Sequence, residues 1–284
     1  MTGPVRLLVV LAAVAAPGIA VAEDLETRDR KDRDETTRTL ERALVRQGGL
    51  VLRPGVFELE PGLVYAYREV NAVRRDALTS ALTLRLGLPW GTQGDVQAPY
   101  VLLDRQAGLG TTSGLGDVDV ALTKQLLVGG PARSVPDLLL TVHWKTATGA
   151  SGGSLPPGTG THSIAGFLTA VERDDPLVLL VSIYYSWNLR ARDLDRGDAI
   201  GAILRMLLAA TPNTSLLLGI DAASFFATTL QGQSVPGSER LIAVLDLGLA
   251  TILWRDLFLN VTAGIGITPA APDFQIAIAL PFRL

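Results

Sequence analysis

The residues of this chain that could do chemistry come in pairs two positions apart. Three such pairs stand out: Glu58 with Glu60, Asp117 with Asp119, and His143 with Lys145. Successive side chains of a β-strand point to opposite faces, so each pair would project from one face of a strand into the same space. Paired carboxylates attract cations, but two per strand are too few to predict a metal site. The sequence therefore predicts neither a metal nor another cofactor.

The segment that ends the chain shows the alternation most clearly. One face holds Phe274, Ile276, Ile278, Leu280, Phe282 and Leu284, and the other holds Gln275, Ala277, Ala279, Pro281 and Arg283. An unprotected apolar edge is an aggregation hazard in water, whereas the last strand of a closed barrel pairs with the first. We therefore interpret the six apolar residues as the closing strand and as the assembly signal for the barrel-assembly machinery.

From residue 56 onward, the sequence pattern indicates strands separated by turns. We predict twelve strands, over 56–69, 76–88, 95–105, 115–128, 136–148, 160–173, 176–190, 196–210, 213–230, 239–252, 256–267 and 273–284. Most exceed the roughly 9–11 residues that a tilted membrane-spanning strand needs, and all exceed the soluble average of about 5–6. The predicted fold class is all-β, a transmembrane antiparallel β-barrel of about 12 strands in the bacterial outer membrane.

The links between these strands sort by length. One set comprises residues 70–75, 106–114, 149–159, 191–195, 231–238 and 268–272, and the other comprises 89–94, 129–135, 174–175, 211–212 and 253–255. The second set contains the shortest links, as the periplasmic turns of outer-membrane barrels do. An even strand number would then return both termini to the periplasm.

Composition excludes other classes of protein. Apolar residues make up 48% of the chain and the mean hydropathy is +0.32, yet no segment after residue 22 could span a bilayer as a helix. The absence of cysteine excludes disulfides and thiolate chemistry. The net charge of -3 argues against a nucleic-acid partner.

The N-terminal residues differ from the rest. Arg6, the apolar stretch 7–16 and the Ala20-Val21-Ala22 cleavage site predict a signal peptide over residues 1–22. Residues 23–48 form a short charged segment, which we predict to be a periplasmic helix, a disordered arm or a plug in the pore. Gly48-Gly49 ends it, and residues 49–284 form the barrel.

The polar faces of the strands would enclose a lumen. The candidate lining residues are Glu58, Glu60, Arg85, Asp117, Asp119, His143, Lys145, Tyr184, Asn188, Arg205, Asp221, Asp246 and Asn260. Charges inside a barrel either set selectivity or pair with one another and brace the pore. The excess of acids predicts a preference for cations or neutral solutes. We expect passive passage of small solutes, hydrophobic or aromatic ones included. Outer-membrane lipid and this cargo are the expected partners, and a homo-oligomer is left open.

Three segments resemble a known family. They are residues 46–63, which begin Arg46-Gln-Gly-Gly49, residues 113–122 around Gly114-Leu-Gly-Asp117, and Trp144-Lys-Thr-Ala-Thr-Gly149 followed by 158–162. They resemble the outer-membrane proteins named for the meta-pathway of phenol degradation. The first also resembles the related functional-amyloid secretion pore of pseudomonads. The resemblance implies a barrel pore that acts as a transporter, and it leaves export of a secreted polypeptide, such as an amyloid subunit, as an alternative.

Catalysis on membrane lipid is a second alternative. The only histidines are His143, beside Lys145, and His162, which follows a Gly/Pro-rich loop and precedes Ser163. Neither belongs to a motif that supplies a nucleophile with a base and an orienting group. We therefore predict no catalytic residue and no enzyme.

Five aromatic residues lie near the ends of the predicted strands: Trp144, Tyr185, Trp187, Trp254 and Phe258. Aromatic side chains concentrate at the two membrane interfaces of barrels, which is the role expected here. Core packing is the alternative for Phe258.

Overall fold

The computed structural model describes residues 43–44, 46–70, 73–105, 110–129, 135–150, 156–174, 176–191, 194–254 and 257–284. The predicted signal peptide and residues 23–42 of the charged segment lie outside the described residues.

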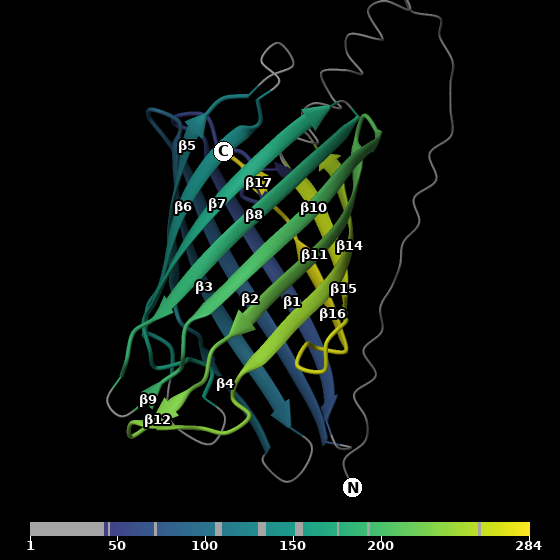
Figure 1. The fold of residues 1–284 in the computed structure, drawn as a ribbon. Coiled ribbons are helices and arrows are strands. Elements are labelled where there is room, and N and C mark those ends of the chain that lie inside the picture. Colours follow the sequence, from purple (N-terminus) through teal and green to yellow (C-terminus); the bar gives the residue numbers. More distant parts are fainter. Residues whose placement is uncertain are drawn as a thin grey trace, which may run out of the picture.

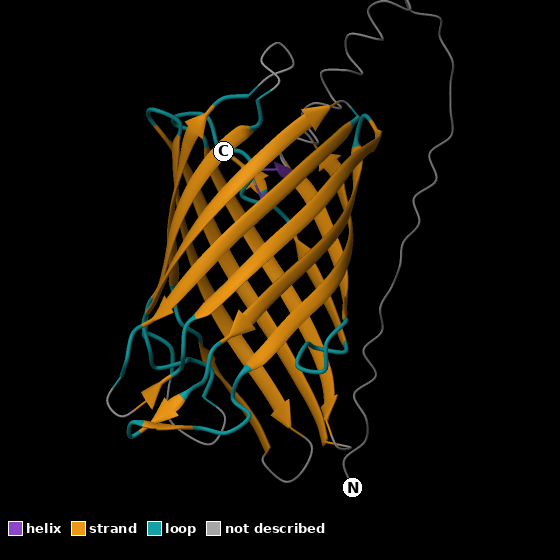
Figure 2. Cartoon of the chain, viewed as in Figure 1, coloured by secondary structure: helices purple, strands orange, loops and turns teal. Residues whose placement is uncertain are grey.

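The described strands close into one antiparallel barrel (Figures 1 and 2). In chain order its wall contains β1 (Phe57–Val70), β2 (Val73–Leu88), β3 (Thr92–Arg105), β4 (Gly110–Leu115), β5 (Asp119–Leu127), β6 (Asp137–Lys145), β7 (Ser163–Asp174), β8 (Leu177–Asn188), β10 (Ala199–Thr211), β11 (Thr214–Phe225), β14 (Arg240–Trp254), β15 (Leu257–Gly266), β16 (Phe274–Ala279) and β17 (Phe282–Arg283). Because β4 and β5 share the partner β3, and β16 and β17 share β1, these described segments make twelve wall strands. The prediction of twelve is confirmed.

The barrel closes between its first and last strands, as predicted. Gly62 pairs with Ala279 and Tyr67 with Phe274, and the pairing continues at Glu58 with Arg283. The other wall strands pair with their neighbours in sequence, which is an up-and-down barrel without a free edge.

The last predicted strand is interrupted at Pro281. Proline has no amide hydrogen to donate to the ladder, so regular pairing stops between β16 and β17. The neighbouring groups still bond, because Leu280 N–H donates to Pro61 O at 3.0 Å and Phe258 N–H donates to Pro281 O at 3.0 Å. The wall therefore stays closed across the break.

The two rims of the barrel differ, as the link lengths predicted. The rim that carries the C-terminus, here called the C-terminal rim, has short turns such as 89–91 and 212–213. The opposite rim, here called the loop rim, carries the long links and a small sheet of β9 (Leu194–Asp195), β12 (Thr229–Leu230) and β13 (Gln233–Ser234).

The outer wall is apolar. On β2 the exposed Leu82, Leu84 and Leu86 alternate with the buried Thr83 and Arg85. Other exposed outer residues include Leu140, Val142, Leu179, Val181, Ile183, Leu204, Leu247 and Ile265. A continuous apolar band on a closed barrel is the surface that membrane hydrocarbon covers, so this is a barrel of the outer-membrane type. In the part of the chain that the structure describes, no helix is long and apolar enough to cross a membrane.

Four of the five predicted interface aromatics are exposed on the wall: Trp144, Tyr185, Trp187 and Trp254. Phe258 is only 3% exposed and shares the inward face of β15 with Asn260. The prediction that Phe258 lies at a membrane interface is therefore wrong, and the alternative of core packing holds. The alternation of β15 turns this side chain inward, where it packs in the core.

Candidate functional site

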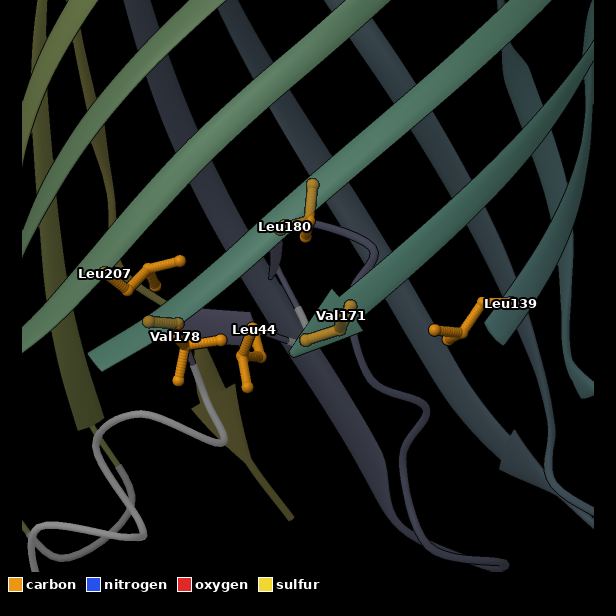
Figure 3. Close-up of a cluster of buried hydrophobic side chains, with 7 residues drawn as sticks. Leu44, Leu139, Val171, Val178, Leu180 and Leu207 are labelled. Atoms are coloured by element: carbon orange, nitrogen blue, oxygen red, sulfur yellow. The ribbon is translucent and has the colours of Figure 1, made fainter. Parts of the chain in front are cut away.

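The start of the described chain lies inside the lumen at the C-terminal rim. Residues 43–44 and 46–56, here called the inner segment, precede β1. Leu44 belongs to a buried apolar cluster, here called the Leu44 cluster, with inward-facing residues of β6, β7, β8 and β10 (Figure 3), namely Leu139, Val171, Val178, Leu180 and Leu207. An inward leucine of an open pore would contact water. The 0% exposure of Leu139 and Leu180 means that the lumen is filled at this level.

A glycine pair ends the helical turn of the inner segment, as predicted. Gln47 N–H donates to Ala43 O at 3.1 Å and Gly49 N–H donates to Leu44 O at 2.8 Å, while Gly48 has φ +72°. These bonds are those of a Schellman C-cap, which needs a residue in the left-handed region. Gly49 is needed for another reason, because a Cβ there would lie 2.7 Å from Leu180 Cδ1.

The opposite side of the helical turn contacts charged residues of the barrel wall. Arg46 lies two residues after Leu44, about 200° around a helix. Its Nε bonds Glu60 Oε1 at 3.2 Å, and Arg85 Nη1 donates to Glu60 at 2.7 Å and Glu58 at 2.8 Å. Arg283 Nε bonds Glu58 at 3.0 Å, and Asp95 lies 3.8 Å from Arg85. These six residues, here called the charge network, contain three acids and three bases.

Backbone contacts hold the rest of the inner segment. Leu52 N–H donates to Gln93 Oε1 at 2.8 Å, and Gly55 N–H donates to Gly87 O at 2.9 Å. A Cβ on Gly87 would lie 2.0 Å from Arg53 O, so only glycine lets the segment pass this close to β2.

A polar cavity of about 270 Å³, here called the lumenal cavity, remains beside the inner segment. Arg46, Glu60 and Arg85 line one part of it, and Asp119 and His143 line another. The Asp119 Oδ1 atom is buried and has no hydrogen-bond partner among the described residues, and His143 Nε2 lies 3.8 Å from it. A water-accessible space lined by this carboxylate therefore lies on the β1–β6 side of the lumen.

The family-like motifs meet at Asp117. Its carboxylate accepts from Gly149 N–H at 3.0 Å and from the N–H and hydroxyl of Thr159 at 2.7 and 2.5 Å. Thr146 Oγ1 donates to Val118 O at 2.8 Å. Residues 113–122, 144–149 and 158–162 thus form one junction, which holds the link between β6 and β7 against the inner wall. Asp117 is bound by this link rather than free in the lumen.

The middle of the lumen holds smaller contacts. Arg205 Nη2 bonds Asp221 Oδ2 at 2.6 Å, and Gln275 donates to Asp246 at 3.3 Å. Tyr184 stacks on Phe167 with ring centroids 4.7 Å apart. It also covers Gly201, where a Cβ would lie 2.4 Å from the ring.

The thirteen predicted lining residues do not form one site. Three of them, Glu58, Glu60 and Arg85, belong to the charge network. Asp119 and His143 line the lumenal cavity. Lys145 lies near this cavity, because it pairs with Asp119 across β5 and β6. On the other side of the lumen lie Arg205, Asp221, Asp246 and Tyr184. At the loop rim, Asn188 donates to Gly197 O. Asn260 is buried near the inner segment. Their role as the lining of a solute path is a proposal.

Sequence reasoning missed several inward residues, among them Asp95, Arg283, Phe167 and Arg46. Asp95 shares a face of β3 with Gln93 and Gln97, and Arg283 was on the polar face of the final strand, so alternation could have found both. Phe167 follows from its pairing with Tyr184 across β7 and β8. No local sequence pattern predicts that Arg46 lies in the lumen, because its position depends on the inner segment folding back into the barrel.

Comparison with known proteins gives the same fold. No protein-family model matches the chain. The chain is similar to an outer membrane channel from Pseudomonas putida F1, with a TM-score of 0.76 and 14% identity, over 83% of this chain and 97% of that one. It is also similar to the NanC porin, with a TM-score of 0.52, 8% identity, and coverage of 80% and 100%. For the translocator domain of the autotransporter NalP from Neisseria meningitidis, the TM-score is 0.52, the identity 8%, and the coverage 91% and 98%.

These likenesses define the class of protein. At such identities they show the fold, which is an outer-membrane β-barrel, and they agree with the apolar wall and polar interior described above.

Proposed function

We propose that this protein is a passive channel for small solutes in the bacterial outer membrane. The observation that carries the proposal is a closed barrel whose apolar outer wall encloses a polar cavity of about 270 Å³. A space of this size admits water and small solutes. The similar solved structures include a channel and a porin, which supports the same function.

The inner segment acts in this proposal as a partial plug. It fills the apolar side of the lumen through Leu44 and is fixed to the opposite wall through Arg46. Solutes then pass through the lumenal cavity, and displacement of the segment widens the path. The loop rim faces the outside, because the short turns of such barrels are periplasmic.

The finer assignments remain proposals. Membership of the phenol meta-pathway family is supported by the junction at Asp117, which unites two of the three resembling segments. Small hydrophobic or aromatic solutes are compatible with the Phe167–Tyr184 stack in the lumen. A preference for cations now depends on Asp119 and Asp246, since Glu58 and Glu60 are balanced by arginines. Outer-membrane lipid is the environment of the wall, and we propose that residues 274–284 are the signal for assembly of the barrel.

The two alternatives have less support. A secreted polypeptide could pass only after the inner segment left the lumen, because Leu139 and Leu180 are fully covered. For a lipid enzyme, no serine or threonine hydroxyl is hydrogen-bonded to His143 or His162 within the described part of the chain. A positioned nucleophile and base are what such catalysis requires. We therefore propose a channel without enzymatic activity.

Planar-bilayer conductance tests the proposal. Leu44→Asp places a carboxylate in an apolar cluster, which costs several kcal/mol unless the segment moves out. We expect a higher single-channel conductance for this variant, while Leu44→Met, which keeps the volume and polarity, behaves as wild type. Absence of conductance in all three proteins would contradict the channel.

A further inference from the structure

A second cavity, separate from the lumenal cavity, lies at the loop rim. Its volume is about 580 Å³, within the range of about 300–1,000 Å³ typical of small-molecule sites. Three arginines line it: Arg68 near the end of β1, Arg196 after β9, and Arg240 at the start of β14. Long links of the loop rim supply most of the remaining wall.

The three guanidinium groups have no carboxylate partner among the described residues. None of the three has an ion pair within 4.0 Å to a described residue, although the exposed Glu239 also lines the cavity. Arg68 Nη2 donates to Pro269 O at 2.9 Å and Arg196 Nη2 donates to Thr159 O at 2.9 Å. These bonds hold two guanidinium groups in place but leave their charges unbalanced.

Further donors of the two fixed arginines are unused. The Nε atoms of Arg68 and Arg196 are buried and have no hydrogen-bond partner among the described atoms. Buried donors without partners are rare in folded proteins, so the described residues leave part of each guanidinium group unsatisfied. A guanidinium group offers two parallel N–H groups that match a carboxylate, so an organic acid can bind the side of each guanidinium group that lines the cavity.

The cavity also has an apolar part. Phe225 lies beneath Arg240, with the guanidinium carbon 4.9 Å from the ring centroid, and Leu194 and Pro269 line the same space. A ligand that suits this wall carries an apolar body beside its negative group, unlike inorganic phosphate.

We propose that the loop-rim cavity binds small organic carboxylates at the entrance of the barrel. The position of this cavity at an entrance rests on the proposed channel function, whereas the binding does not. Arg68 and Arg196 bind the carboxylate, and Phe225 and Leu194 contact the apolar body.

Binding of benzoate to the full-length protein in lipid nanodiscs, followed by calorimetry, tests the inference. We expect saturable binding that weakens about tenfold in Arg68→Gln or Arg196→Gln, because one charge-assisted pair is lost. Benzamide, which has the same shape without the charge, should bind at least about tenfold more weakly. Arg190→Gln is the matched control, since Arg190 is an exposed arginine near this rim that does not line the cavity.

Several results would overturn the site. They are no saturation by benzoate, equal binding of benzamide, equal weakening by Arg190→Gln, or phosphate binding as tight as benzoate binding. Heat-modifiable gel mobility checks that each variant is folded. If Arg196→Gln fails to fold, Arg68→Gln carries the test. Loss of conductance with benzoate binding intact would reject the channel function alone, whereas conductance without benzoate binding would reject the carboxylate site alone.

Discussion

The two rims of the barrel use arginine in opposite ways. At the C-terminal rim, Arg85 is 9% exposed and bonds Glu58 and Glu60, and the whole charge network has as many acids as bases. At the loop rim, Arg68 and Arg196 donate to backbone carbonyl oxygens, have no carboxylate partner among the described residues, and line an open cavity. Buried charges are tolerated when they are paired, because pairing offsets the loss of hydration. Charge balance thus separates arginines that hold the fold from arginines that can bind a ligand.

The difference also assigns a role to each end of the lumen. The charge network and the Leu44 cluster together fix the inner segment on two sides, so the C-terminal rim is the narrow end. The loop rim keeps about 580 Å³ of cavity with an unbalanced positive charge. Organic anions would therefore be bound at the loop rim, and passage through the lumen would be restricted at the C-terminal rim. Three experiments test whether the two rims differ in this way.

The largest effect is expected from removing the last four residues. Deletion of 281–284 removes the bond from Leu284 N–H to Phe57 O, the pairing of Leu59 with Phe282, and the Arg283–Glu58 ion pair. Closure of the barrel then fails, and we expect complete loss of heat-modifiable mobility in gels. The assembly role proposed for Phe274, Ile276, Ile278, Leu280, Phe282 and Leu284 predicts the same result.

Deletion of 233–236 is the control for this experiment at the other rim. These residues are exposed and lie in the small loop-rim sheet or beside it, so the shortened protein should still fold. If the protein lacking 281–284 folds equally well, the closing strand is not required and the comparison between the rims loses its basis.

An intermediate effect is expected from single arginine replacements. Arg85→Met leaves Glu58 and Glu60 buried beside each other with fewer partners, which destabilises by about 3–5 kcal/mol. Arg240→Met at the loop rim loses only an exposed contact with Phe225, worth about 0.5–1 kcal/mol. Urea unfolding in lipid vesicles, followed by tryptophan fluorescence, measures both. Equal losses of stability would show that the two rims do not differ as proposed.

The wall of the barrel could be predicted because alternation is a local property. Leu82, Leu84 and Leu86 are exposed and Arg85 is buried simply because side chains alternate along β2. The same rule placed Glu58, Glu60 and Asp119 on the inner face. It could not show that Glu58 pairs with Arg283, since the partners are joined only when the first and last strands meet.

The contents of the lumen could not be predicted in the same way. Arg46 reaches Glu60 because residues 43–56 return into the barrel, and Asp117 binds a link that begins about 30 positions later in the chain. The loop-rim arginines come from three distant parts of the chain, and links have no period that would assign their faces. Phe258 was misassigned because its place near a strand end outweighed its parity with Asn260.

The smallest effect concerns Asp119, the carboxylate of the lumenal cavity whose Oδ1 has no hydrogen-bond partner in the part of the chain that the structure describes. A unit charge acts on an ion about 7 Å away in water with about 0.6 kcal/mol, roughly a threefold change in local cation concentration. Asp119→Asn should therefore shift the reversal potential under a salt gradient toward weaker cation preference, and the shift should vanish near 1 M salt, where screening acts over about 3 Å. Asp76→Asn is the control, because Asp76 bonds Tyr65 and Arg74 and shares a face of β2 with the exposed Leu82 and Leu84. An equal shift in both variants would mean that the bias comes from the outer surface and that solutes do not pass Asp119.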